Sequence, residues 1–321
     1  MFRRVAEWLA PGEIVMSVAV AGGTGFVGGA VVAELVRRSQ PAVILSRQPE
    51  RSSRNLPPGV EARGVDVATA APDEIAAVLA GADALVIALA FDGMPMEKPG
   101  RGRTFEAVDA GGTERLVAAA KLAGIRRLVY VSGAGAAPDA ARHWFRAKWR
   151  AETAIRGSGI VFTIIRPTWI YGPADVSLNR FLGFARWLPF VPLLNDGRQH
   201  LAPVFIDDVA GLAVDALTDP AAADATFELG GPETYEMREI VRTALRVAGR
   251  RRAVLPGPTP LIKLAAWPLA FLPRPPLTPA AVDFINQPAI VDVGPLLAAM
   301  PRRLTPLDEG LRTYLGPAAT R

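Results

Sequence analysis

A run of closely spaced glycines marks the first place in the chain where chemistry can be assigned. The sequence Gly22-Gly23-Thr24-Gly25-Phe26-Val27-Gly28 follows the short apolar run 17–21 and opens a helix-like segment, residues 26–38. In a strand-loop-helix unit, Gly-x-x-Gly-x-x-Gly allows a tight turn, a close backbone approach to a pyrophosphate, and close helix–strand packing. The helix amino terminus adds N–H groups and a partial positive charge. The pattern predicts a dinucleotide phosphate site at Gly22, Thr24, Gly25, Phe26, Val27 and Gly28.

The end of the second expected strand indicates which dinucleotide is bound. Sites specific for NAD place an Asp or Glu there, on the ribose 2′-hydroxyl. This chain has Leu45-Ser46-Arg47 instead, with Arg51 and Arg54 nearby. Serine and arginine can donate hydrogen bonds to a 2′-phosphate, and the arginine fork suits phosphate geometry. Ser46 and Arg47 therefore favour NADP(H) over NAD(H).

Strand-like and helix-like segments alternate through the first half of the chain. The expected strands are 17–21, 42–46, 60–65, 84–88, 127–131 and 161–166, and the expected helices are 26–38, 73–79, 104–123 and 142–156. Continuous apolar strands separated by helices indicate a parallel sheet covered on both faces, with right-handed crossovers. We predict an α/β fold, a Rossmann-type doubly wound parallel sheet.

The second half differs in composition. Residues 171–201 are rich in aromatics, proline and leucine and show no strand periodicity, whereas short strands are expected at 204–206, 227–229 and 253–255 and helices at 207–217 and 236–248. Ligands of open α/β sheets bind beyond the carboxyl ends of the strands. We predict a smaller C-terminal lobe over those ends for substrate or partner (171–201 and 231–321), a cofactor-binding core (16–170 and 202–230) and an N-terminal extension (1–15).

Composition excludes several classes of site. The chain has no cysteine and only two histidines, so thiolate metal sites and a cysteine nucleophile are ruled out, and we expect no metal. The formal charge of +5 comes from dispersed arginines without a basic stripe, so we expect no nucleic-acid partner. No segment reaches the ~20 apolar residues that span a bilayer, and residues 1–15 do not resemble a signal peptide. We therefore expect a cytoplasmic protein.

Several motifs resemble those of extended and atypical short-chain dehydrogenases. They are the glycine loop, Gly112-Thr113-Glu114-Arg115-Leu116-Val117, Leu128-Val129-Tyr130-Val131-Ser132 and Arg166-Pro167-Thr168-Trp169-Ile170-Tyr171-Gly172-Pro173. Other segments are similar to the atypical branch that includes the NADPH-binding accessory subunit of respiratory complex I and its bacterial relatives. These are Pro203-Val204-Phe205-Ile206-Asp207-Asp208-Val209-Ala210, Gly231-Pro232-Glu233, residues 250–256 and residues 305–311. The resemblance covers residues 17 to about 315.

The resemblance implies further cofactor contacts. It implies that Asp66 and Val67 lie beside the adenine, that Ala88, Leu89 and Ala90 line the ribose side, and that Pro167, Thr168, Trp169 and Ile170 pass the nicotinamide. Asp109 stands where relatives often have asparagine.

The catalytic centre departs from the family pattern of serine or threonine, tyrosine, and lysine four residues after the tyrosine. Lys148 matches the lysine, Trp144 occupies the tyrosine position, and Gly133 falls at the serine position with Ser132 next to it. An indole cannot cycle a proton as a phenol does. Neither Tyr130 nor Tyr171 is followed four residues later by a lysine. Ser132 and Lys148 remain the candidate catalytic and cofactor-binding residues, because an ammonium can still bind nicotinamide-ribose hydroxyls.

These residues leave three functions open, and whether the chain is an enzyme stays open with them. The first is an NAD(P)H-binding protein with a degenerate triad, acting as a structural or redox-sensing component. The second is an NADPH-dependent oxidoreductase of an apolar carbonyl or quinone-like substrate. The third is a sugar-nucleotide epimerase or dehydratase, which the apolar segment 181–194 disfavours.

Two apolar segments bear on the choice of partner: Phe181, Phe184, Trp187, Leu188, Phe190 and Leu193, and then Leu261, Leu264, Trp267 and Leu269. One interpretation is that they pack on each other as the roof of a pocket for an apolar small molecule. The other is that part of them stays exposed and meets a protein partner or a membrane surface, with Arg180 and Arg186 facing anionic lipid. A location peripheral to the membrane would follow from the second interpretation.

Overall fold

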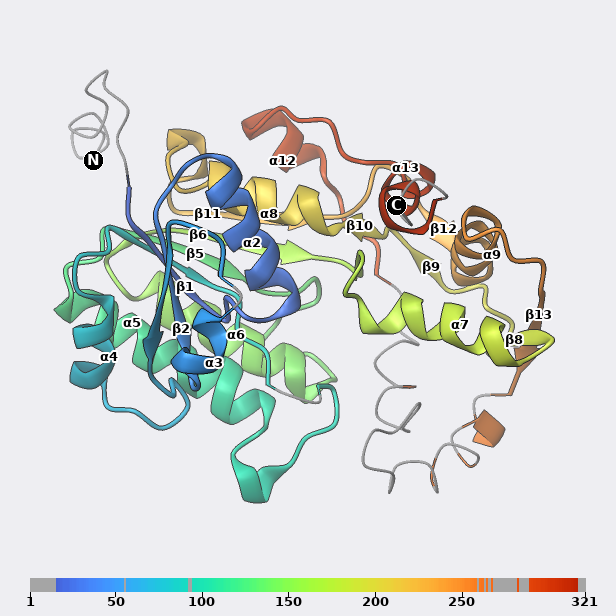
Figure 1. Ribbon diagram of the computed structural model, residues 1–321, viewed down its shortest axis with the longest axis horizontal. Coiled ribbons are helices and arrows are strands. Elements are labelled where there is room, and N and C mark those ends of the chain that lie inside the picture. Colours follow the sequence, from blue (N-terminus) through green and yellow to red (C-terminus); the bar gives the residue numbers. More distant parts are fainter. Residues whose placement is uncertain are drawn as a thin grey trace.

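A seven-stranded parallel sheet forms the centre of the protein (Figure 1). The computed structural model describes residues 16–54, 56–91, 94–258, 260–262, 264, 267, 282 and 289–316. The strand order is β11-β6-β5-β4-β1-β2-β3, and every neighbouring pair is parallel. The strands are β1 (Val18–Ala21), β2 (Ala42–Ser46), β3 (Val60–Gly64), β4 (Ala84–Ile87), β5 (Arg127–Val131), β6 (Val161–Pro167) and β11 (Ala225–Leu229). This confirms the predicted Rossmann-type fold.

Helices cover both faces of the sheet because the central strands are apolar on both sides. One face packs against α2 (Phe26–Arg37), α8 (Ile206–Asp215) and α12 (Gly294–Ala299). The other packs against α4 (Pro72–Leu79), α5 (Gly112–Leu122) and α6 (His143–Arg156). All residues of β1, β2, β4 and β5 are buried. The order reverses between β1 and β4, so the carboxyl ends of these two strands form the crevice in which such sheets bind ligands.

A second apolar cluster lies beyond the sheet, at the end of the molecule that carries α7, α9 and α13 (Figure 1). Helix α7 (Val176–Trp187) packs against α9 (Met237–Val247), and α9 against α13 (Leu307–Leu315). Three two-stranded ladders join this region: β7 (Ile170–Tyr171) with β10 (Val204–Phe205), β8 (Phe190–Leu194) with β13 (Ala253–Gly257), and β9 (His200–Leu201) with β12 (Tyr235–Glu236). The remaining elements are α3 (Pro49–Ser53), η1 (Pro99–Arg101) and η3 (Pro220–Ala222).

The structure corrects two of the predicted elements. Residues 104–123 do not form one α-helix: η2 (Phe105–Gly111) is a π-helix, and α5 begins at Gly112. Residues 171–201 were expected to contain no strand but contain β8 and β9 and part of β7. Their strands pair with segments far along the chain, so local periodicity does not reveal them. The predicted extension 1–15 and Leu269 lie outside the described residues.

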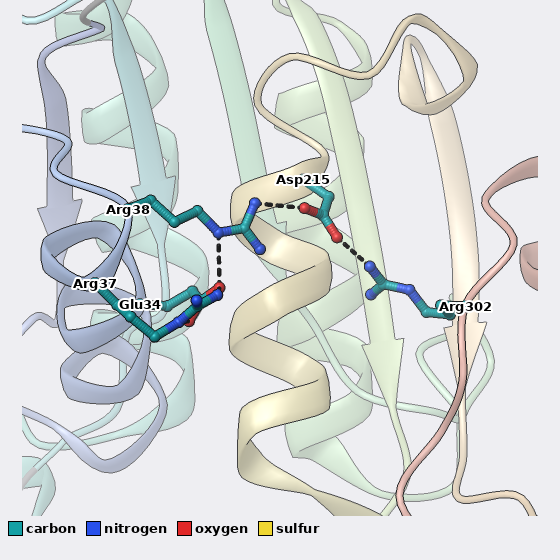
Figure 2. Close-up of polar contacts among 5 residues, drawn as sticks. All are labelled: Glu34, Arg37, Arg38, Asp215 and Arg302. Atoms are coloured by element: carbon teal, nitrogen blue, oxygen red, sulfur yellow. Dashed lines mark hydrogen bonds and ion pairs between the residues drawn. The ribbon is translucent and has the colours of Figure 1, made fainter.

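A polar network fastens the first helix to the last part of the chain (Figure 2). Arg38, at the end of α2, donates to Glu34 at 2.7 Å and to Asp215 of α8 at 2.5 Å. Asp215 also pairs with Arg302, which follows α12. About two turns earlier on α8, Asp208 accepts hydrogen bonds from the amide and hydroxyl of Thr305. Arg302 and Thr305 are therefore held against α8.

None of the helices within the described residues is long and apolar enough to cross a membrane.

Candidate functional site

The glycine loop is packed so tightly that side chains would not fit at two of its positions. Gly22 has a φ of +87°, and a Cβ there would lie 2.2 Å from the carbonyl oxygen of Ala88. A Cβ on Gly28 would lie 2.2 Å from the carbonyl oxygen of Gly22. The loop thus brings the start of α2 against the carboxyl ends of β1 and β4, where the sequence pattern predicts the phosphates.

The amino terminus of α2 has the properties of an anion site. Gly25 is its N-cap, no side chain caps the helix, and no acidic residue lies in its first turn. The first N–H groups of an α-helix have no partner within the helix. Thr24 and Gly25 are exposed, so a pyrophosphate can reach these donors and the positive end of the helix dipole. The residues present fit a dinucleotide phosphate.

The two residues expected at the ribose 2′-position, Ser46 and Arg47, lie at the end of β2 in different environments. The buried Ser46 hydroxyl accepts a hydrogen bond from the Gln48 amide at 3.1 Å and lies 2.8 Å from Ser52 Oγ. Because Ser52 donates to the Gln48 carbonyl, the Ser46 proton is directed to Ser52. Arg47 is exposed and forms no ion pair with any residue that the structure describes. Of the two, Arg47 is the donor that the described residues leave exposed.

The residues expected beside the adenine and the ribose converge on the carboxyl ends of β3 and β4. A Cβ on Gly112 would lie 3.2 Å from a Leu89 methyl group and 3.6 Å from Val67 Cγ2. Asp66 Oδ1 accepts a hydrogen bond from the Ala68 amide at 3.0 Å, which fixes the turn after β3. Ala88 meets Gly22, and Ala90 is exposed. These residues surround the same crevice as the glycine loop.

The segment 167–170 is held at the opposite side of the crevice by backbone hydrogen bonds. The Pro167 carbonyl accepts from the Ala134 amide, and the Thr168 amide donates to the Leu229 carbonyl, both at 2.9 Å. Ile170 lies in β7, whose partner is β10. A Cβ on Gly172 would lie 3.4 Å from the Phe26 ring. The segment therefore adjoins the start of α2.

Lys148 forms a buried ion pair instead of standing free. Its Nζ lies 2.6 Å from Asp109 Oδ1, 3.5 Å from the Val131 carbonyl oxygen and 5.3 Å from the centroid of the Tyr130 ring. Asp109 is 1% exposed and belongs to the π-helix η2. Burial alone would lower the pKa of Lys148, but the Asp109 carboxylate and the Tyr130 hydroxyl outweigh it, and the net pKa is raised. Lys148 is therefore held as an ammonium, with Asp109, the Val131 carbonyl and the Tyr130 hydroxyl as the partners of its three protons.

Trp144 belongs to a packed aromatic cluster. It contacts Phe105 at a centroid distance of 6.0 Å, and Phe105 meets Phe91 edge-on at 4.9 Å. The neighbouring His143 lies 2.9 Å from Glu97, which also accepts from the Phe105 amide. The position of the family's tyrosine is thus filled by an indole that is 8% exposed. Tyr130 cannot replace the phenol for a substrate, because it is fully buried and burial raises its pKa.

Ser132 is directed to a structural partner. Its hydroxyl donates to Glu152 at 2.6 Å, and Glu152, fully buried in α6, also accepts from Arg166 and Arg156. The structure therefore commits the side chain of this candidate catalytic residue to an internal network. A Cβ on Gly133 would lie 3.7 Å from the Phe145 ring.

Two partners of the candidate catalytic residues were not anticipated from the sequence. Glu152 lies four residues after Lys148, and a charged residue at that spacing on a buried helix face is a usable signal for a buried network. The approach of Asp109 to Lys148 depends on the π-helix and carries no comparable signal.

Comparison with known proteins decides the family. A family described as NAD(P)H-binding matches residues 22–183. The chain belongs to this family. It is also 31% identical to NADH dehydrogenase [ubiquinone] 1 alpha subcomplex subunit 9, mitochondrial, of Arabidopsis thaliana, over 79% of this chain and 63% of that protein. The mouse protein of the same name is 32% identical over 50% of this chain, and the match spans only 42% of its length.

A reductase is similar over a larger part of its own length. The (4-alkanoyl-5-oxo-2,5-dihydrofuran-3-yl)methyl phosphate reductase of Streptomyces griseus is 31% identical, over 73% of this chain and 74% of that protein. The resemblance to the short-chain dehydrogenase superfamily, including its complex I subunit branch, is thereby confirmed.

Solved structures support the fold. UDP-glucuronic acid 4-epimerase from Bacillus cereus superimposes with a TM-score of 0.72 at 16% identity, over 92% of this chain and 97% of that one. The Citrobacter sp. triphenylmethane reductase, complexed with NADP(H), gives a TM-score of 0.71 at 23% identity, over 93% and 99%. At such identities the likeness concerns the Rossmann-type architecture.

Proposed function

We propose that this protein holds NADP(H) as a resident ligand and serves as a structural or redox-sensing component with little turnover. The observation that carries the proposal is the Lys148–Asp109 ion pair at 2.6 Å beside Trp144, which occupies the tyrosine position. The relatives named as subunits of mitochondrial NADH dehydrogenase are consistent with a role inside an assembly. A cytoplasmic location is part of the same proposal.

The chemistry at the catalytic centre favours a non-catalytic role. A bound nicotinamide dinucleotide supplies hydride, and a dehydrogenase must add a proton at the carbonyl oxygen, a contribution of typically 10²–10⁴-fold. Trp144 carries an indole in place of the phenol, Gly133 has no hydroxyl, and the Ser132 hydroxyl is bonded to Glu152. Lys148 matches the lysine that the family places at the nicotinamide ribose, but it lacks a tyrosine four residues before it.

The preference for NADP(H) rests on Arg47. We expect NADPH to bind more tightly than NADH in a fluorescence titration. A charge-assisted contact is worth ~1.5–3 kcal/mol, roughly ten- to a hundred-fold in affinity, and Arg47→Ala should remove most of that difference. Arg101→Ala, which removes another exposed arginine, is the matched control. Equal titration curves for NADPH and NADH with the wild-type protein would refute the preference.

Turnover is measured as NADPH oxidation with a panel of quinones, aldehydes and ketones. We expect the wild-type protein to bind NADPH and to oxidise it far more slowly than the ~1 s⁻¹ at the lower end of ordinary enzymes. Lys148→Ala should weaken NADPH binding, because the ammonium acts on the ligand and not on a proton-transfer step. Unchanged NADPH affinity in Lys148→Ala would remove Lys148 from the binding site.

A second candidate function is reduction of an apolar carbonyl or quinone-like substrate. The cluster of Phe91, Phe105 and Trp144 offers an apolar wall, and the His143–Glu97 pair at 2.9 Å is a substitute proton source next to it. The reductase relative from Streptomyces griseus supports this alternative. A rate above about 1 s⁻¹ that His143→Ala abolishes, while His200→Ala leaves it unchanged, would establish the reductase and overturn the non-catalytic proposal.

A further inference from the structure

Helix α7 and strands β8 and β13 lie at one end of the molecule (Figure 1). Large apolar side chains of these elements are exposed. Trp187 is 85% exposed, and Leu188, Phe190 and Leu255 are between 37% and 45% exposed. We call these four residues the α7–β13 surface. Leu261, shortly after β13, is also exposed.

This surface is one face of a small sheet, not a scatter of single residues. Strands β8 and β13 pair in parallel, with Phe190 beside Ala253 and Pro192 beside Leu255. Alternate residues of a strand share a face, so Phe190, Pro192 and Leu255 point to the same side. Val191 and Leu193, on the other side, are buried against the apolar cluster that includes α9. The inner face builds the fold, whereas the outer face is equally apolar and meets solvent.

Arginines lie beside this surface. Residues 176–195 and 240–258 contain seven arginines and no Asp or Glu. Two of these arginines have acidic neighbours from other segments: Arg246 pairs with Asp308 at 3.1 Å, and Arg180 lies near Asp175. Arg250 and Arg252 donate to the carbonyls of Leu182 and Ala185 at 2.6 and 3.2 Å, which fastens the basic segment to α7 just before Trp187. Arg186 and Arg251 are exposed.

We propose that the α7–β13 surface docks the protein on an anionic lipid membrane. Trp187, Leu188, Phe190 and Leu255 enter the interfacial region, and Arg186 and Arg251 face lipid phosphates. Exposed apolar residues beside basic ones bind such surfaces through buried apolar area and attraction to anionic lipid. Tryptophan is suited to this interface, since one end of its ring is apolar and the other donates a hydrogen bond. This inference goes beyond cofactor binding and does not depend on it.

Co-sedimentation tests the proposal with two kinds of vesicle, one of phosphatidylcholine alone and one of equal parts of phosphatidylcholine and phosphatidylglycerol. The wild-type protein should sediment with the anionic vesicles, should stay in solution with the neutral ones, and should be released by added salt. Protein that stays in the supernatant with anionic vesicles, or that binds both kinds equally, overturns the proposal.

Two pairs of variants locate the contact. Trp187→Ser combined with Phe190→Ser should lower the partition coefficient by at least about tenfold, whereas Leu122→Ser, at a comparably exposed leucine at the end of α5, should not change it. Arg186→Glu should lower it by at least about fivefold and Arg101→Glu much less, although both change the net charge equally. Equal effects within either pair would refute this surface as the contact.

Size-exclusion chromatography separates the alternative occupant. A dimer in solution that Trp187→Ser converts to a monomer, without vesicle binding, would assign the surface to a second copy of the chain and overturn the lipid proposal. Thermal unfolding of each variant confirms that its fold is intact.

Discussion

Two buried carboxylates meet helix α6 about one turn apart, and they are satisfied in different ways. Glu152, on α6 itself, accepts hydrogen bonds from Ser132, Arg156 and Arg166. Asp109 reaches α6 from η2 and, within the described residues, pairs with the single ammonium of Lys148. Glu152 is held by three donor side chains, whereas Asp109 relies on one ammonium at the carboxyl end of β5. The difference predicts that Glu152 contributes more to the stability of the fold than Asp109 does.

The largest effect that this comparison predicts is on the free energy of unfolding. Glu152→Gln keeps the size of the side chain but leaves two guanidinium groups without their carboxylate. Breaking a buried ion pair in this way costs ~3–5 kcal/mol, measured by urea unfolding. Glu114→Gln is the matched control, because Glu114 on α5 pairs with Arg150 of α6 at the surface. This substitution should cost at most ~1 kcal/mol. Similar losses of unfolding free energy in both variants would contradict a special structural role for the buried Glu152 network.

Asp109→Asn should have a smaller effect with a characteristic pH dependence. The raised pKa of Lys148 means that its stabilising contribution is fully present below the ordinary lysine pKa and is lost only as pH rises through the higher folded value. Without the carboxylate, burial lowers the pKa of Lys148, so the unfolded chain binds the proton more readily than the folded one. The variant should lose ~1–3 kcal/mol at neutral pH and recover stability as pH rises toward the ordinary lysine pKa.

The measurement for Asp109→Asn is a series of urea midpoints from neutral to alkaline pH. Asp83→Asn, in an exposed pair with Arg126, serves as the control and should show no recovery. A midpoint of Asp109→Asn that stays parallel to the wild-type value throughout the series would mean that Lys148 is not held by Asp109.

A third buried carboxylate, Asp175, extends the comparison to a case without a direct cation. It caps α7 by accepting from the amides of Ser177 and Leu178, and burial raises its pKa to about 6. A raised carboxyl pKa means that the folded state holds the proton more tightly, so this group's contribution to stability falls as pH rises from 3.8 to about 6. Asp175→Asn should abolish that dependence, and Asp175→Ala should cost ~1 kcal/mol at any pH through loss of the cap.

The thermal midpoint at successive pH values between those limits checks the Asp175 prediction. At each pH the thermal midpoint of Asp175→Asn is compared with that of the wild type, since other groups titrate in the same range. A difference that is independent of pH would contradict the raised pKa.

The smallest effect is expected for the partly exposed network of Figure 2. Arg302→Ala leaves Asp215 paired with Arg38, and exposed ion pairs contribute at most ~1 kcal/mol. Added salt should reduce the effect further. A loss as large as that of Glu152→Gln would show that the attachment of the last segment to α8 is a major source of stability.

The sequence was most informative where a single segment determines its own structure. Strands Ala42–Ser46 and Arg127–Val131 were predicted to the residue, because each is a buried run with clear boundaries. The glycine loop was equally readable, since its spacing reflects the close approaches of Gly22 and Gly28. These features depend on neighbours in the chain and on simple steric limits.

Features that depend on distant partners were less accessible. Ser132 and Gly133 are adjacent, and only the position of Glu152 shows where the serine hydroxyl points. The apolar residues of 181–193 divide between the core and the surface: Phe181 and Leu193 are buried, while Trp187 is almost fully exposed. All three are large and apolar, so composition does not separate them, whereas packing against the cluster that contains α9 does.

The π-helix at Phe105–Gly111 makes the site vulnerable to a change in chain length. A π turn accommodates one more residue than an α turn, and each residue of an α-helix turns the chain by about 100°. Deleting one residue between Phe105 and Asp109 would let an ordinary helix form, more regular than the present one. It would also rotate Asp109 about the helix axis relative to Phe105. Asp109 could then reach Lys148 only if Phe105 left the aromatic cluster. An insertion or deletion here could therefore separate the two halves of the ion pair without substituting either partner.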